Sequence, residues 1–137
     1  MKNFVAAMSV VLGFAACTPE GSQLSSDAVQ DVTTVDAFLA LGARQLTGSE
    51  ITSRVVGRTL DEGSWTWMIE GNGTHWAQAD DGSWSDSGGR WELRGDEYCR
   101  NSPERPRMNC SRMYMIGNFL RMGNTSGDLA EWTVQVL

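Results

Sequence analysis

Basic residues are scarce in this chain, which has 11 lysines and arginines against 17 aspartates and glutamates and a formal net charge of −6. Proteins that bind nucleic acid neutralise its phosphates with a basic face, so this balance argues against a nucleic-acid partner. Only 3 prolines are present against 15 glycines, which favours many tight turns. Hydrophobic residues make up 41% of the 137 residues, enough for the core of one domain and too many for wholesale disorder.

No apolar run is long enough to span a bilayer, which takes about 20 residues. The most apolar stretch, residues 4–14, follows the single lysine of the chain, Lys2. A positive start followed by a short apolar run is typical of a secretory signal peptide. We therefore expect residues 1–16 to be a signal peptide that directs export.

The end of this stretch resembles the lipobox of bacterial lipoproteins, because Phe14-Ala15-Ala16-Cys17 places two small residues directly before a cysteine. In that family the cysteine thiol receives a diacylglycerol, the chain is cut before the cysteine, and the new amine is acylated with a fatty acid such as palmitate. The resemblance implies a membrane anchor at Cys17. Thr18 stands where many inner-membrane lipoproteins have aspartate, which implies an outer-membrane lipoprotein facing the periplasm. The alternative is ordinary secretory cleavage and release into the periplasm.

Residues 17–45 are expected to form the lipidated cysteine and a flexible tether, because small polar residues dominate residues 18–32. A short helix capped by Thr33 is expected near the apolar patch at Phe38, Leu39 and Leu41.

A clearer helix signal follows at Thr47 and Glu50, which fit a capping box. It predicts a short helix over residues 48–56, and Gly57 is placed to end that helix in the left-handed conformation.

From Arg58 onward the apolar period changes to two, as in the alternation of Trp65, Trp67 and Ile69 with more polar neighbours. Glycine-containing turn signals recur at residues 71–73, 81–82, 95–96 and 117–118. In the first of these, Asn72-Gly73 favours a hairpin turn with positive φ at both central residues. The pattern predicts a mainly β domain over residues 46–137, a small antiparallel β-barrel or meander of seven to eight strands.

The short motifs that recur in this region resemble those of a group of small exported bacterial proteins of uncharacterised function. The likeness covers about residues 46–123 and rests on Gly57-Arg58-Thr59, Asn72-Gly73-Thr74, Gly89-Arg90-Trp91, Tyr98-Cys99 and Cys110. It implies a compact β domain and carries no catalytic residues across.

With Cys17 assigned to lipid, Cys99 and Cys110 remain as an even pair in an oxidising compartment, which favours a disulfide between them. A zinc site needs about four ligands, and the chain offers one histidine, His75, and no CxxC motif. We expect no metal and no cofactor.

Six tryptophans lie in the β region, and most of them suit the core of a small barrel. Trp76 and Trp84 flank polar turns and are the candidates for stacking against a small ligand. Asp80, Asp81 and Asp86 suggest calcium, but they lack the spacing of a calcium loop, and Asp-Gly favours a solvated turn. No nucleophile motif accompanies His75, so we expect no catalytic residues and no enzyme.

Arginines gather in and beside the segment between the two cysteines, at Arg100, Arg105, Arg107 and Arg112. We take Arg105 and Arg107, in the loop of residues 101–109, as candidates for binding an anionic ligand or partner, including a lipid headgroup. The alternative is a solvated loop stiffened by its two prolines.

The function expected from the sequence is a lipid-anchored protein of the cell envelope that acts as a non-enzymatic binding or interaction module. Its partners would be the membrane, through the lipid, and an envelope protein or anionic ligand. The alternatives are a periplasmic inhibitor of a hydrolase and a small-ligand-binding barrel.

Overall fold

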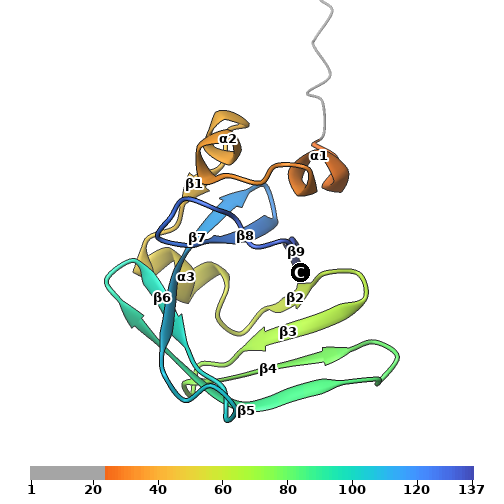
Figure 1. The fold of residues 1–137 in the computed structure, drawn as a ribbon, viewed down its shortest axis with the longest axis vertical. Helices are drawn as coiled ribbons and strands as arrows, with labels where there is room; N and C mark the ends of the chain where they lie inside the picture. Colours follow the sequence, from red (N-terminus) through yellow and green to blue (C-terminus); the bar gives the residue numbers. More distant parts are fainter. Residues whose placement is uncertain (1–23) are drawn as a thin grey trace, which may run out of the picture.

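A computed structural model describes residues 24–137 of the protein (Figure 1). In this part of the chain three short helices precede or interrupt the strands: α1 (Ser26–Gln30), α2 (Val35–Ala40) and α3 (Gly48–Arg54). The strands are β1 (Arg44–Gln45), β2 (Thr59–Asp61), β3 (Trp65–Ile69), β4 (Thr74–Ala79), β5 (Ser85–Arg94), β6 (Glu97–Arg100), β7 (Asn109–Ile116), β8 (Phe119–Gly123) and β9 (Val134–Val136). No helix among these residues is long and apolar enough to cross a membrane.

Strands β2 to β9 form a closed antiparallel barrel in which each strand pairs with the next along the chain. The ring closes where β9 pairs with β2, in the register that joins Leu60 to Val136. β1 lies outside the ring and pairs with β7. The predicted antiparallel barrel of seven to eight strands is therefore confirmed.

Alternation along the strands sends every second side chain into the barrel, as in β3, where Trp67 and Ile69 are both buried. They join buried residues from β6, β7 and β8, among them Tyr98, Met113 and Leu120, in one core. Three other tryptophans predicted for the core, Trp65, Trp91 and Trp132, are partly buried and pack against it.

Helix α3 supplies the core at one end of the barrel through Ile51 and Val55, which are both fully buried. Its predicted capping box is present: Thr47 accepts from the Glu50 N–H, and the Glu50 carboxylate accepts from the Thr47 N–H. The helix itself ends at Arg54, and Gly57 has the predicted positive φ of 78°. The Asp96 carboxylate in the β5–β6 turn also accepts from the Gly48 N–H at 2.8 Å, which fastens the helix to that end.

The β3–β4 hairpin differs from the prediction in its turn. Gly73 has a φ of 87°, but no residue other than glycine has a positive φ among residues 24–137, so Asn72 does not adopt the left-handed conformation. The Asn72 side chain instead accepts from the Thr74 N–H at 3.0 Å and from the Thr74 hydroxyl at 2.6 Å. The asparagine acts through its side chain, as in an Asx turn.

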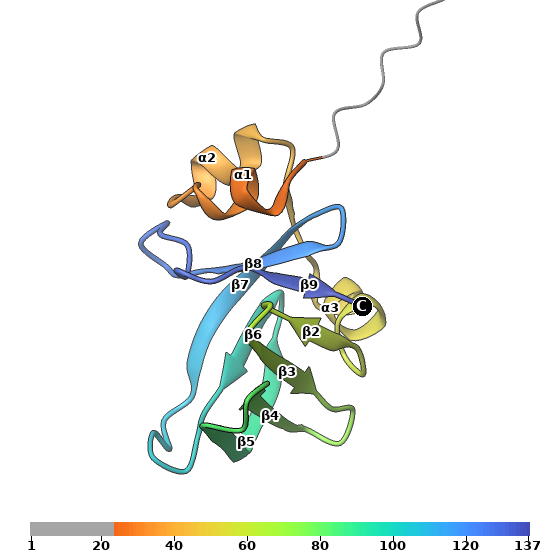
Figure 2. The same ribbon diagram turned by 90° about the vertical axis from the view of Figure 1, so that its right-hand side faces the viewer.

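The short helix expected near Phe38 is present as α2, and a further helix, α1, lies within the stretch expected to be a flexible tether. Helices α1 and α2 pack on the outer face of β7 and β8, where Val29 and Phe38 are fully buried against Tyr114 (Figure 2). The cap of α2 is Thr34 rather than the predicted Thr33. The predicted signal peptide and Cys17 lie outside the described residues.

A buried arginine on β8 explains why such short helices are ordered. Arg121 is 1% exposed, and its Nη1 donates to the carbonyls of Val29 at 2.9 Å, Gln30 at 3.4 Å and Val32. Its Nη2 donates to the Ala130 carbonyl. Burial lowers the pKa of Arg121. A cation therefore gathers the unsatisfied carbonyls at the C-terminal end of α1 and ties the helix to the barrel.

We expect Arg121→Met to release α1 and α2 from the barrel while leaving the ring intact. The substitution keeps an unbranched apolar stem but leaves buried carbonyls without donors, so the free energy of unfolding should fall by about 3 kcal/mol. Amide hydrogen exchange should speed up in residues 26–45 and stay slow in β3 to β6. The matched control is Arg112→Met, which removes an exposed ion pair with Glu97 and should cost less than about 1 kcal/mol. Equal losses in the two variants would contradict this role for Arg121.

Candidate functional site

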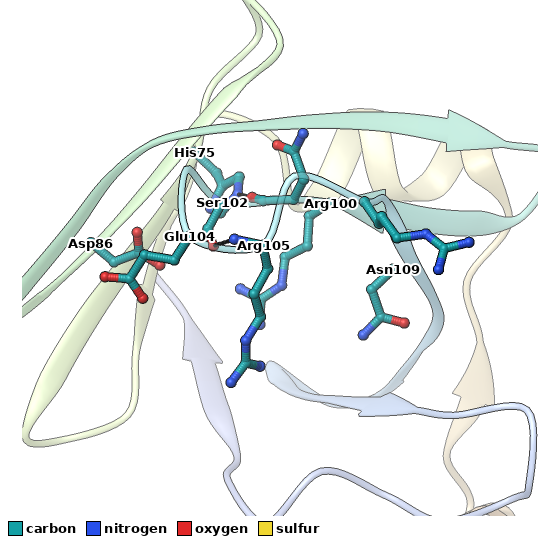
Figure 3. A pocket seen from close by; sticks show the side chains of 9 residues that line it. His75, Asp86, Arg100, Ser102, Glu104, Arg105 and Asn109 are labelled. Carbon is teal, nitrogen blue, oxygen red and sulfur yellow. Dashed lines mark hydrogen bonds between the residues drawn. The ribbon is translucent and has the colours of Figure 1, made fainter.

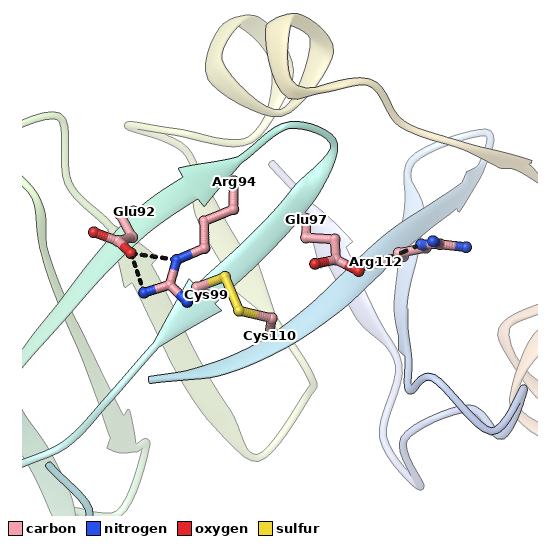
Figure 4. Close-up of a disulfide and its surroundings, with 6 residues drawn as sticks. All are labelled: Glu92, Arg94, Glu97, Cys99, Cys110 and Arg112. Atoms are coloured by element: carbon pink, nitrogen blue, oxygen red, sulfur yellow. Dashed lines mark hydrogen bonds and ion pairs between the residues drawn. A yellow bond between two sulfur atoms is a disulfide. The ribbon is translucent and has the colours of Figure 1, made fainter. Parts of the chain in front are cut away.

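The disulfide predicted from the cysteine count is present between Cys99 on β6 and Cys110 on β7 (Figure 4). The two residues lie directly opposite each other in the sheet register, with their Cα atoms 3.9 Å apart. The ion pair of Glu92 and Arg94 lies beside Cys99, which is fully buried. The bridge closes the base of the β6–β7 connection and holds its two ends together.

The loop above the disulfide is organised around Asn101. Its side-chain oxygen accepts from the Arg90 N–H at 2.9 Å, and its side-chain nitrogen donates to the Pro106 carbonyl at 3.1 Å. Ser102 and Arg105 exchange backbone hydrogen bonds of 3.0 Å, which makes a tight turn at the tip. These bonds tie the loop to β5 and close its tip.

A cavity lies beneath this loop, between it and the β4–β5 hairpin (Figure 3). Its lining combines charged and polar side chains from four strands and the loop: His75, Asp86, Arg100, Asn101, Ser102, Glu104, Arg105, Arg107 and Asn109. We call this cavity, together with the second one described below, the barrel mouth. Arg105 and Arg107, the candidates from sequence, both line it.

Arg100 is the arginine that reaches into the barrel. It follows Tyr98 by two residues on β6, so it shares the inward face of the strand. Its guanidinium carbon lies 5.0 Å from the centre of the Trp67 ring, a cation–π contact. In Figure 3 the side chains of Arg100 and Arg105 extend in the same direction, away from the loop.

None of the three arginines of the mouth has a carboxylate within 4.0 Å among residues 24–137. Glu104 and Asp86 line the cavity but form no ion pair with them. Arg112, which the sequence groups with the loop arginines, pairs with Glu97 at 3.8 Å and lies outside the mouth cavities. The predicted cluster therefore consists of Arg100 and the two loop arginines.

His75 closes the inner side of the mouth and is 3% exposed. Its Nε2 donates to the Asn101 carbonyl at 2.8 Å, which links β4 to the loop. Burial lowers the pKa of His75, and the charge of Arg100 lowers it further, against opposing effects from the Asn101 carbonyl and Asp86. Gly89 permits this contact, because a Cβ there would lie 2.2 Å from the His75 Nε2 and 2.7 Å from the Asn101 oxygen.

A second cavity continues from the first one and shares Arg100 and Asn109 with it. Its remaining lining is largely apolar on the β8 side, with Met122, Leu129, Ala130 and Trp132, and polar at the rim, with Ser111, Gly123, Asn124 and Asp128. The ring of Trp132 meets that of Trp67 edge to face, with 5.8 Å between their centres. Arg100 thus lies between the charged cavity and the apolar wall of the second one.

The two tryptophan candidates, Trp76 and Trp84, lie away from the mouth cavities. Trp76 projects from β4 into a separate shallow depression, and its Nε1 donates to the Glu70 carboxylate at 2.9 Å. Trp84 is 46% exposed in the β4–β5 turn and packs against Trp65, with 6.2 Å between ring centres. The tryptophan of the mouth is Trp132.

The acidic residues weighed as calcium ligands have separate surroundings. Asp81 accepts from the Ser83 N–H at 2.9 Å, Asp80 from the Thr66 hydroxyl at 3.4 Å, and Asp86 lines the mouth. Within residues 24–137 no group of three or more histidine, cysteine, aspartate or glutamate side chains is placed to hold a metal ion.

Sequence reasoning grouped Arg100 with the loop arginines without assigning it a binding role, and it missed His75 and Trp132 as members of the same site. A usable signal exists for Arg100, because alternation from Tyr98 places it on the inward face. His75 and Trp132 reach the mouth only through long-range pairing, which one sequence does not reveal. Comparison with protein-family models, curated proteins and solved structures found no match for the chain.

We expect the stability of the protein to fall as the pH drops through and below about 6.5, because of His75. Its folded-state pKa lies below the usual value of 6.5, so the unfolded chain takes up the proton first and unfolding is favoured. Well above pH 6.5 both states are neutral at this residue and the effect disappears. Urea unfolding across this pH range measures it.

Since His75 is the only histidine, the His75→Gln variant is a clean control, and its unfolding free energy should vary less over the same range. An identical pH profile in the two proteins would contradict the assignment.

Proposed function

We propose that the protein is a lipid-anchored component of a bacterial cell envelope and that its barrel is a non-enzymatic binding module for an anionic group. One observation carries the binding proposal. Arg100, Arg105 and Arg107 line one mouth without a carboxylate within 4.0 Å among the described residues, on a chain of net charge −6.

Arginine suits this role because its planar guanidinium donates two parallel hydrogen bonds to a carboxylate or phosphate. A local positive field on an acidic protein also steers an anionic partner toward the mouth. The loop that carries Arg105 and Arg107 is held by the disulfide and by Asn101, so little conformational entropy is lost when it binds.

The position of the loop supports an anchored binding module. In both views the β6–β7 connection lies at the opposite end of the molecule from α1, where the described chain begins (Figures 1 and 2). Cys17 precedes α1 in the chain, so a lipid there would attach the molecule to the membrane through its α1 end. The loop would then face away from the membrane.

A second candidate, inhibition of a hydrolase, is favoured by the rigidity of the same loop. A protruding segment with internal hydrogen bonds and a covalent base is suited to occupy a cleft on another protein. It differs from the first proposal in its partner, which would be an enzyme that loses activity when the loop binds.

We expect the full chain to carry lipid on Cys17 when it is exported in a bacterial host. Intact-mass spectrometry should show a mature chain that begins at Cys17 with a diacylglycerol and an acyl group added. The Cys17→Ser variant should keep its uncut mass and gain no lipid. A wild-type chain with a free Cys17 thiol would overturn the anchor and leave the binding module untested by this measurement alone.

We expect Arg105→Glu combined with Arg107→Glu to weaken capture of an envelope partner by the full chain about 10- to 100-fold, because charge reversal repels an anionic group. Affinity capture from native envelopes, quantified by mass spectrometry, measures the loss. If a captured hydrolase loses its activity in the presence of the wild-type chain, the second candidate is the correct one.

The matched control is Arg54→Glu combined with Arg58→Glu, two exposed arginines near α3 that also lack a carboxylate within 4.0 Å. It makes the same change in net charge outside the mouth and should keep the partner. A partner retained by the Arg105 and Arg107 variant would overturn the proposal.

A further inference from the structure

Two buried polar groups next to Arg100 have no hydrogen-bond partner. Among residues 24–137, the Trp67 Nε1 and the Tyr98 hydroxyl are both buried without one. Their rings meet edge to face with 5.7 Å between centres, and Trp67 is the ring on which Arg100 lies. Buried polar groups are nearly always paired in folded proteins, so this pair needs an explanation.

Both groups are hydrogen-bond donors. An indole nitrogen can only donate, and burial raises the pKa of Tyr98, which keeps its hydroxyl protonated. Arg100 adds further hydrogen-bond donors and cannot accept a hydrogen bond. The Tyr98 hydroxyl can also accept one hydrogen bond, but the Trp67 Nε1 and the Arg100 guanidinium can only donate. These three groups therefore bring more donors than acceptors, and a negatively charged acceptor would complement Arg100.

The surroundings of Arg100 also specify what is attached to that acceptor. On one side lies the charged cavity with Arg105 and Arg107, and on the other lies the second cavity, in which Met122, Leu129 and Trp132 form an apolar wall beside polar groups that include Asp128. A ligand that is anionic throughout would leave this apolar wall unused. A neutral apolar ligand would leave Arg100 without a counter-charge in a half-buried site.

We propose that the barrel mouth binds a small amphipathic carboxylate, with its carboxylate on Arg100 and its apolar part against Trp132, Met122 and Leu129. The guanidinium carbon lies over the Trp67 ring and has no carboxylate within 4.0 Å among the described residues, so its N–H groups are available to donate to both carboxylate oxygens. The ligand is small because the core side chains already fill the interior of an eight-stranded barrel.

This inference deepens the proposed function, since it uses the same mouth, but it depends on Arg100 rather than on the loop arginines. The proposed function and this inference can therefore be contradicted independently of each other. Capture of a macromolecular partner tests the role of Arg105 and Arg107, whereas binding of a small carboxylate tests the role of Arg100 and of the apolar wall of the second cavity.

The probe is octanoate, titrated into the full chain carrying Cys17→Ser in detergent-free buffer and followed by tryptophan fluorescence and calorimetry. We expect saturable binding at one site, with Trp132 and Trp67 as reporters. Octanol has the same tail without the charge, and acetate has the charge without the tail. Each should bind at least about tenfold more weakly than octanoate, and affinity should rise from butyrate through hexanoate to octanoate.

The decisive variant is Arg100→Gln, which keeps hydrogen-bonding capacity but removes the charge. It should weaken octanoate binding about 10- to 100-fold and leave octanol binding unchanged. Arg112→Gln, on the outer face of the neighbouring strand, is the matched control and should bind octanoate as the parent chain does. If Arg100→Gln does not fold, Arg100→Lys decides, because it keeps the charge but loses the two parallel donors and should weaken octanoate binding several-fold.

The inference is overturned if octanoate shows no saturable binding, if octanol binds equally well, or if Arg100→Gln and Arg112→Gln bind octanoate alike. Each of these results is compatible with loss of a partner in the Arg105 and Arg107 variant, so the proposed function would survive them. The converse result is octanoate binding that requires Arg100 while the Arg105 and Arg107 variant still captures the partner. That result would support this inference and overturn the proposed function.

Discussion

The barrel depends on one closing contact, in which the last strand of the chain pairs with β2 on one side and with β8 on the other. β9 has only 3 residues, yet its register joins Leu60 to Val136 and Leu120 to Val134. Leu60, Leu120 and Val134 are fully buried, so closure and core formation are the same event. Without β9, β2 and β8 would each present an unpaired backbone edge, which is a site for aggregation.

Closure also decides where chemistry can occur. A ring of eight strands leaves an interior that side chains just fill, and here Trp67, Tyr98 and Met113 occupy it. Helix α3 covers one end by burying Ile51 and Val55 in the same core. At the other end, the β6–β7 loop and the β8–β9 connection leave cavities lined by arginine and tryptophan.

Features decided by neighbouring residues could be predicted from the sequence: the strands by alternation, α3 by the capping box at Thr47, and the disulfide by two cysteines that flank one loop. Helix α1 could not, because it is held by Arg121, a residue 92 positions beyond the Val29 carbonyl it binds. The site was predictable in part. Its loop arginines stand out by composition, whereas His75 joins them only through a hydrogen bond to the Asn101 carbonyl and the absence of a side chain on Gly89.

Two arginines in this barrel show how the same side chain becomes structural or available for binding. Arg121 points outward from β8 beneath α1, and both of its terminal nitrogens donate to backbone carbonyls. Arg100 points inward from β6 and is held by the face of Trp67, with no carboxylate in reach among the described residues. The terminal nitrogens of Arg121 are taken up by carbonyls, whereas the guanidinium of Arg100 lies over an aromatic ring and keeps its donors for a ligand. This difference in hydrogen bonding, more than charge or burial, makes Arg100 the group on which recognition at the mouth should turn.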